Sequence, residues 1–220
     1  MVTETFKRAR AHQRYRLKDG TVVPGVTTIV GLLNKPQLVN WANRLGLQGI
    51  DASAHVQAAA GAGTCAHEMI QEVLGGPAVD LGKYSGEEIE AAQNAADKFR
   101  AWLQGHKMET QAIEMQLVSE RYRVGGTIDW FGRLDGKMTL ADIKTSGRIY
   151  DEHIIQVAAY SKLLEEAGYE VEAVRILRFG REDDENARDM VLTTRQVERG
   201  WEVFAHLREI YELLKFIKTA

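Results

Sequence analysis

The chain has 220 residues, 45% hydrophobic and 27% charged, which is enough apolar material for one globular domain with a real core. Its one cysteine, Cys65, excludes an internal disulfide and any four-cysteine zinc or iron–sulfur site. The net charge of −3 gives no overall basic signature for nucleic acid. No apolar run approaches the roughly 18 residues that predict a membrane span, and the N-terminal residues lack the apolar core of a secretory signal.

The charge is unevenly distributed. Residues 1–50 carry a net +6, against −3 for the whole chain. The cations of this part are Lys7, Arg8, Arg10, Arg14, Arg16, Lys18, Lys35 and Arg44. A basic arm on an acidic body is suited to phosphate contacts, but a solvated surface hairpin explains the same pattern, and both interpretations stay open.

Periodicity and turn residues predict the elements in chain order. They are strands at 14–17 and 22–30; helices at 37–45, at 52–74 with an interruption near 61–63, and at 86–104; strands at 111–118, 122–134 and 137–145; a helix at 151–167; strands at 171–179 and 189–192; and a helix at 194–217. Ser85 and Glu88 form a capping box for the third helix. Because no linker is long enough to separate two domains, we expect a single domain: a basic addition (1–50), a core (51–180) and a C-terminal strand and helix (181–220).

One hairpin holds the most informative pattern. Asp135-Gly136 predicts a two-residue turn, because glycine accepts the positive φ that such a turn needs. Counting back along both strands from this turn places Asp129 directly opposite Asp142, where Cβ atoms are about 4.5–5.5 Å apart. Since strand side chains alternate between faces, Lys144 shares the face of Asp142.

Opposed carboxylates in a sheet repel each other, so a compensating cation is expected beside them. Lys144 supplies one charge, and a hard divalent ion such as Mg²⁺ or Mn²⁺ suits carboxylate oxygens. The residues alone leave two other readings open. One is a surface strand with scattered charges, and the other is a bulge that shifts the pairing and puts the aspartates on opposite faces.

Further side chains are candidates for the same site. Gln156 and Tyr160 are four residues apart on a predicted helix and share a face, although a core-edge Tyr160 and a solvated Gln156 fit equally. His67 lies in a helix rich in small residues, where a lone histidine is usually structural or exposed. Glu114 can approach Asp129 from a third strand, in a register that the sequence leaves open.

The order and spacing of these pieces resemble the PD-(D/E)XK nuclease superfamily, specifically its RecB-like branch. The motifs are Gly63-x-x-x-His67, Gly126-Thr-Ile-Asp129, Asp142-Ile-Lys144-Thr and Gln156-x-x-x-Tyr160, and the segment Pro24-Gly-Val-Thr-Thr-Ile29 is similar to phage and mitochondrial genome-maintenance-type exonucleases. The resemblance spans roughly residues 20–180. It implies an α/β restriction-endonuclease-like core, in which helices flank a central mixed β-sheet, with an N-terminal hairpin and helical addition and a C-terminal helix.

The resemblance also implies a metal site. Asp129, Asp142, His67 and the main-chain carbonyl of Ile143 match the ligands of one or two Mg²⁺ or Mn²⁺ ions. Some members carry an iron–sulfur cluster on four cysteines, which a chain with one cysteine cannot hold.

The remaining motif positions match catalytic and substrate-binding residues. Lys144 matches the lysine that orients or activates the attacking water, and Glu114 matches a less constant upstream acid. Gln156 and Tyr160 match the pair that shapes the site and contacts the substrate strand. From the basic arm, we expect Arg14 and Arg16 to contact the substrate as well.

The function implied is a Mg²⁺- or Mn²⁺-dependent deoxyribonuclease that leaves 5′-phosphates and acts on DNA ends as an exonuclease. Its expected partners are DNA and a recombination or replication protein, in the cytoplasm of a bacterial or phage-infected cell and without membrane association. The alternatives are an endonuclease, a non-catalytic nucleic-acid-binding subunit that keeps the nuclease fold, and a metal-dependent phosphatase of small molecules.

Overall fold

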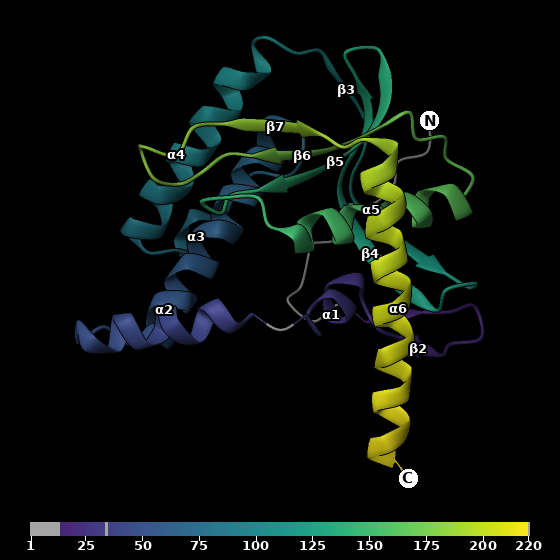
Figure 1. The fold of residues 1–220 in the computed structure, drawn as a ribbon. Helices are drawn as coiled ribbons and strands as arrows, with labels where there is room; N and C mark the ends of the chain where they lie inside the picture. Colours follow the sequence, from purple (N-terminus) through teal and green to yellow (C-terminus); the bar gives the residue numbers. More distant parts are fainter. Residues whose placement is uncertain (1–13, 34, 220) are drawn as a thin grey trace.

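The computed structural model describes residues 14–33 and 35–219 (Figure 1). Its main sheet has the spatial order β3-β4-β5-β6-β7. The strands are β3 (Met108–Ser119), β4 (Val124–Leu134), β5 (Lys137–Lys144), β6 (Ala173–Arg178) and β7 (Arg188–Val191). Neighbouring strands are antiparallel except for the parallel pair β5–β6, so the predicted central mixed sheet is confirmed. The arm residues Lys7, Arg8 and Arg10 lie outside the described residues.

The N-terminal strand prediction is wrong beyond Val23. β1 (Tyr15–Arg16) pairs with β2 (Val22–Val23), but helix α1 (Val26–Val30) follows instead of more strand. The β-branched residues of this segment favour a strand locally. In a helix, however, Val26, Ile29 and Val30 fall on one face and all three are buried in the core. Tertiary burial therefore overrides local propensity here.

Three helices follow and are close to prediction. They are α2 (Pro36–Leu47), α3 (Ala52–Val73) and α4 (Gly86–Leu103), with a short 3₁₀ turn η1 (Leu81–Lys83) before α4. The capping box of Ser85 and Glu88 is present. The expected break in α3 is wrong, because the helix runs unbroken through Gly61. A Cβ on Gly61 would lie 1.8 Å from the Glu88 carboxylate, so this glycine permits close packing of α3 on α4 rather than a kink.

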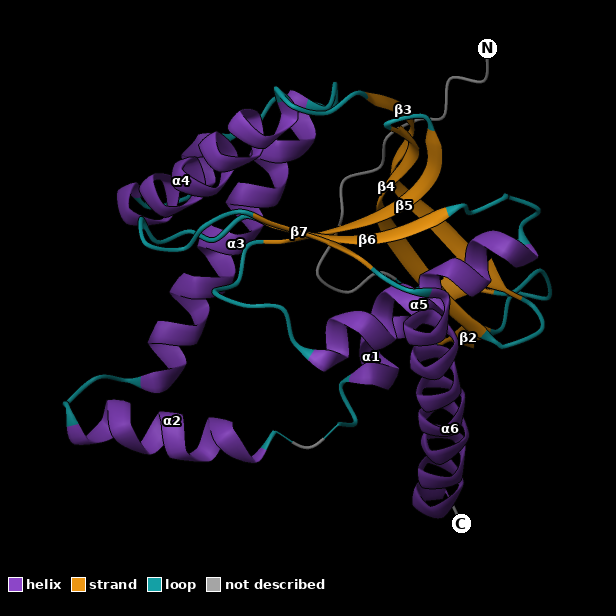
Figure 2. Ribbon diagram, turned by 45° about the horizontal axis from the view of Figure 1, so that its top comes forward, coloured by secondary structure: helices purple, strands orange, loops and turns teal. Residues whose placement is uncertain are grey.

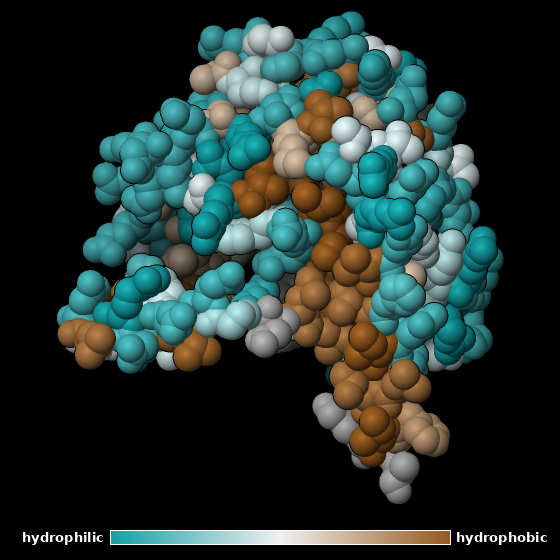
Figure 3. Space-filling view, viewed as in Figure 1, coloured by the Kyte–Doolittle hydropathy of each residue, from teal (hydrophilic) through white to brown (hydrophobic). Residues whose placement is uncertain are grey.

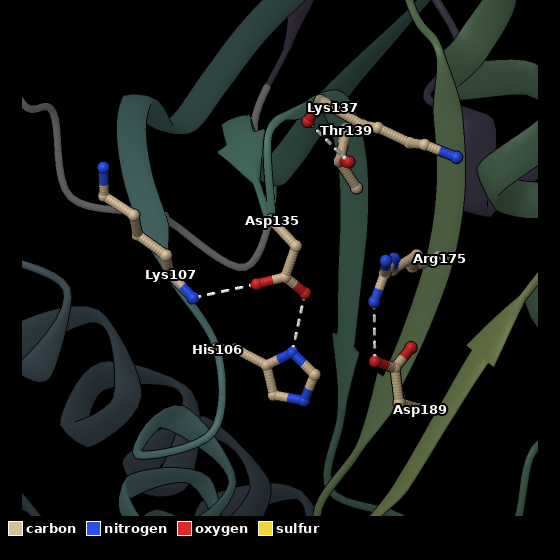
Figure 4. Close-up of polar contacts among 7 residues, drawn as sticks. All are labelled: His106, Lys107, Asp135, Lys137, Thr139, Arg175 and Asp189. Atoms are coloured by element: carbon tan, nitrogen blue, oxygen red, sulfur yellow. Dashed lines mark hydrogen bonds and ion pairs between the residues drawn. The ribbon is translucent and has the colours of Figure 1, made fainter.

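The β4–β5 hairpin has the predicted register. Pairs run from Leu134–Lys137 at the turn to Trp130–Ala141, and the next position places Asp129 opposite Asp142. The turn is fastened from the preceding segment. Asp135 accepts a hydrogen bond from the main-chain N–H of Lys107 (2.9 Å) and lies 2.8 Å from His106 Nδ1 (Figure 4). At the other edge of the sheet, an ion pair between Arg175 and Asp189 (2.8 Å) joins β6 to β7.

The sheet separates two hydrophobic cores. On one face, α1, α5 (Asp151–Glu166) and α6 (Thr194–Thr219) pack around buried side chains such as Phe131 and Leu140. On the other, α3 and α4 pack around Trp130, Ala141 and Ile143. Figure 2 shows the two helical layers on opposite sides of the strands. The alternation predicted for β4 and β5 is thus what distributes the apolar side chains between the two cores.

The distal part of α6 extends away from the body (Figure 1). Its exposed apolar side chains form a brown band along the helix in Figure 3. They include Ile210, Leu213, Leu214, Phe216 and Ile217. Among the helices that the structure describes, none is long and apolar enough to cross a lipid bilayer.

Candidate active site

Asp129 on β4 and Asp142 on β5 stand opposite each other, at the end of the hairpin away from its turn. Asp142 is fully buried, and Asp129 is half-buried. The main-chain N–H of Ile143 donates a hydrogen bond to Asp129 Oδ2 at 2.7 Å, which fixes that carboxylate against the neighbouring strand. The structure therefore brings together the carboxylate pair that the hairpin register predicts.

Lys144 provides the compensating positive charge. Its Nζ lies 2.7 Å from Asp142 Oδ2, and it donates a hydrogen bond to Gln156 Oε1 at 3.2 Å. Burial alone would lower the pKa of Lys144, but the carboxylates of Asp142 and Asp129 outweigh it and raise that pKa above its ordinary value. The lysine is therefore a charged donor at neutral pH.

The carboxylates hold their charge less readily than aspartates in water. Burial raises the pKa of Asp142 to about 6, against the opposing effect of Lys144. Burial also raises the pKa of Asp129, and Lys144 and the Ile143 N–H act in the other direction. One lysine thus only partly offsets the cost of placing two carboxylates here.

Glu114 joins the pair from β3. It lies between the pairs Ile113–Trp130 and Met115–Ile128, at the position opposite Asp129. Its φ of 52° lies in the left-handed region that few side chains adopt, so the strand is locally strained where it meets the site. Burial, with a further contribution from Asp129, raises the pKa of Glu114 to about 8. Glu114 therefore approaches Asp129 from a third strand, in a register that the sequence left open.

His67 on α3 faces the same site. Burial, together with the Lys144 charge and against the opposing effect of Asp142, lowers its pKa to about 4. The imidazole is therefore neutral at physiological pH, which is the form that can ligate a metal.

Asp142 offers a donor atom to a hard divalent ion. Both carboxylate oxygens of Asp142 are buried; Oδ2 lies 2.7 Å from the Lys144 ammonium, whereas Oδ1 has no polar partner. An orphaned buried carboxylate oxygen is costly unless a cation completes it. Within residues 14–33 and 35–219, no three His, Cys, Asp or Glu side chains converge closely enough to hold an ion by themselves. The site therefore fits an ion at Asp142 Oδ1, with the remaining positions left to main-chain and water oxygens.

Gln156 and Tyr160 on α5 continue the polar chain from Lys144. Gln156 Nε2 donates to the Tyr160 hydroxyl at 2.9 Å. Tyr160 is 4% exposed and packs under Gly126, where a Cβ would lie 2.6 Å from its ring. The Tyr160 ring is thus part of the core, and its hydroxyl belongs to the polar chain that runs from Lys144.

A cavity of about 790 Å³ opens beside these residues. Its walls include parts of α1, α3, β3, β5 and α5 and the loop after β6, and its lining includes His67, Gln71, Glu114, Lys144, Gln156 and Arg181. Arg14 and Arg16 do not line it. Both are exposed, and Arg16 donates to the Gly20 carbonyl of its own hairpin. Tyr15 of the same hairpin contacts Thr127 of β4, 2.9 Å between oxygens, so the hairpin lies beside β4.

Two cavity residues were missed from the sequence. Gln71 Nε2 donates to Glu114 Oε1 at 2.6 Å. Its position four residues after His67 puts both on one helix face, and this spacing was a usable signal. Arg181 follows β6 in a segment that reads only as a charged loop, and nothing local in the sequence indicates its position.

No family model and no curated protein matches the chain. Among solved structures, it is similar to a provisionally assigned exonuclease from Eubacterium rectale, with 12% identity and a TM-score of 0.44 over 56% of this chain. That match covers 52% of the other protein, so the chain spans about half of its length. It is also similar to an alkaline exonuclease from Laribacter hongkongensis, with 14% identity and a TM-score of 0.36, covering 89% of this chain and 92% of that one. The complex of that enzyme with dAMP matches at 15% identity and a TM-score of 0.33, over 71% and 85% of the two chains. These likenesses are distant, and the function proposed below stands on the site residues alone.

Proposed function

We propose that this protein is a metal-dependent DNA nuclease of the PD-(D/E)XK type that hydrolyses phosphodiester bonds and leaves 5′-phosphates. One observation carries the proposal: the buried Asp142, opposite Asp129, is paired with Lys144 at the wall of an open cavity. A purely structural role would not require this buried ion pair beside a cavity, because apolar residues of similar volume would fill the same place at lower cost.

Asp142 would hold a Mg²⁺ or Mn²⁺ ion through Oδ1. Asp129, His67 and the main-chain carbonyl of Ile143 are the further ligands that the sequence motifs imply. Asp129 and His67 would have to move closer to the ion, because no three such side chains converge among residues 14–33 and 35–219. Such an ion lowers the pKa of bound water and neutralises charge on a phosphate. The orphaned Oδ1 of Asp142 and the neutral His67 support this assignment. Whether one or two ions bind is left to the titration described below.

The chain's own residues supply positioning and charge. Lys144 is a charged donor, so it holds the attacking water and stabilises negative charge rather than acting as a base. Gln156 accepts from Lys144 and donates to Tyr160, which restricts where the ammonium can point. Glu114, with its raised pKa, is suited to exchanging a proton near neutral pH.

Action on DNA ends, partnership with a recombination or replication protein, and a bacterial or phage cytoplasmic setting are further parts of the proposal that rest on the sequence motifs. DNA itself is preferred as the substrate on the same grounds.

The test uses the full chain with end-labelled linear DNA, single- and double-stranded, and with circular DNA. Cleavage with Mg²⁺ or Mn²⁺ that a chelator abolishes is the expected result, with products that carry 5′-phosphates. A resistant circle identifies an exonuclease, and a cut circle an endonuclease. Calorimetric titration of Mn²⁺ into the protein gives the number of ions. Metal binding with no cleavage of any DNA would contradict the proposal and favour a non-catalytic subunit.

A further inference from the structure

Arg181 presents a guanidinium to the cavity from a loop outside the catalytic motifs. It follows β6, and its side chain crosses to two other elements. Nε donates to the main-chain carbonyl of Thr145 at 3.1 Å, just after β5, and Nη1 donates to the carbonyl of Ala59 on α3. Both partners are uncharged, so these contacts orient the guanidinium without neutralising it.

The loop that carries Arg181 is fastened from behind. Lys98 Nζ on α4 donates to the carbonyls of Gly180 (2.9 Å) and Glu182, and Asn94 Nδ2 donates to the Arg181 carbonyl at 3.1 Å. The main chain on both sides of Arg181 is therefore held by α4. A side chain supported in this way is pre-organised for binding rather than left to find its position in solvent.

The charge of Arg181 is not cancelled nearby. Over the part of the chain that the structure describes, no ion pair joins Arg181 to a carboxylate. Two acids of its own loop have other contacts: Asp183 accepts from Asn94, and the Glu185 carboxylate lies against Gly180 and Gly147. The positive charge of Arg181 also contributes to the lowered pKa of His67, which places it close to the proposed metal ligands.

We infer that Arg181 forms a phosphate subsite on the α3 side of the cavity, which binds a backbone phosphate of the DNA strand next to the one that is cleaved. The inference rests on the proposed function of the same site. A guanidinium has five N–H donors, and the two carbonyls use two of them. The remaining donors suit two oxygens of a phosphate, the geometry in which arginine binds phosphate best. Arg181 is then a substrate-binding residue, and its effect falls on affinity for the strand.

The experiment measures binding of a short fluorescein-labelled single-stranded oligonucleotide by anisotropy, in chelator, so that cleavage plays no part. The proteins are wild type, Arg181→Gln, Arg181→Lys and the matched control Arg188→Ala, an exposed arginine on β7. Arg181→Gln is expected to weaken binding about tenfold and to reduce the salt dependence by roughly one phosphate contact, a slope change of about 0.7. Arg181→Lys keeps the charge, so its affinity is expected to lie between those of Arg181→Gln and wild type.

Three results would overturn the subsite. They are wild-type affinity and salt slope in Arg181→Gln, a lysine variant weaker than the glutamine variant, and a wild-type protein that does not bind the oligonucleotide. A lysine variant weaker than the glutamine variant would mean that the Arg181 side chain only joins α3 to the end of β5. The two proposals fail separately: loss of binding in Arg181→Gln with no cleavage by wild type refutes the nuclease, and cleavage by wild type with unchanged Arg181→Gln binding refutes the subsite.

Discussion

The main-chain N–H of Ile143 donates a hydrogen bond to the Asp129 carboxylate across the β4–β5 pair, at 2.7 Å. This bond ties one acidic residue to the strand that carries the other, so Asp129 and Asp142 move together with the sheet. Sites built on strands are more precisely positioned than sites on loops. The separation of the two carboxylates is therefore a property of the hairpin rather than of flexible side chains.

The Tyr160 hydroxyl is predicted to act through Gln156 on the direction of Lys144. Removing it in Tyr160→Phe leaves Gln156 Nε2 without its acceptor but keeps the buried ring. We expect kcat to fall about tenfold with little change in KM, and the free energy of unfolding to change by about 1 kcal/mol or less. Steady-state cleavage and urea denaturation measure the two effects. The control is Tyr169→Phe, which removes the hydroxyl from a ring packed against Phe131. An equal fall in kcat in this control would argue against the role of the Tyr160 hydroxyl.

Gly126 is predicted to be required for packing of α5 on β4. A Cβ at this position would lie 2.6 Å from the Tyr160 ring and 3.1 Å from Leu163 Cδ1, and both side chains are buried in the core, where they have little room to move aside. Gly126→Ala should therefore lower the free energy of unfolding by about 1–3 kcal/mol, measured by urea denaturation. Gly46→Ala on α2 meets no atom within 4 Å and is a helical control, expected to raise stability by about 0.5–1 kcal/mol. An unchanged free energy of unfolding in Gly126→Ala would show that α5 can shift freely on β4.

Glu114 is predicted to make the metal-free protein less stable as pH rises. Its pKa in the fold is about 8, above the ordinary value of 4.5, so the folded state binds more protons than the unfolded state between these values. The stabilisation is fully present below pH 4.5 and is lost as pH rises through 8. In Glu114→Gln this loss should disappear, a difference on the order of 3–4 kcal/mol between pH 5 and pH 8. Urea unfolding in chelator at several pH values measures it, and parallel curves for the two proteins would contradict it.

The sequence was sufficient for the elements that depend on local signals. Asp135-Gly136 determined the turn, and the period-two pattern of both strands then determined which residue faces Asp142. The capping box of Ser85 and Glu88 likewise set the start of α4. These features are encoded within a few residues, so they can be predicted without knowledge of the tertiary fold.

Features that depend on distant contacts could not be predicted in this way. Helix α1 forms from β-branched residues because the core on one sheet face accepts Val26 and Ile29, and α3 stays unbroken because Gly61 packs against Glu88. The strained φ of Glu114 and the position of Arg181 follow from how strands and helices meet in space. In each case the deciding partner is remote in the sequence.

The most direct test of the central claim is single-turnover cleavage of end-labelled DNA with Mg²⁺ or Mn²⁺ by wild type, Lys144→Ala and Asp142→Asn, beside Arg188→Ala. Folding of each variant is checked by circular dichroism. The account predicts cleavage by wild type and Arg188→Ala, with a rate about 10²–10³-fold lower in each site variant. Undiminished cleavage by both folded site variants would show that the phosphodiester is cut elsewhere in the protein.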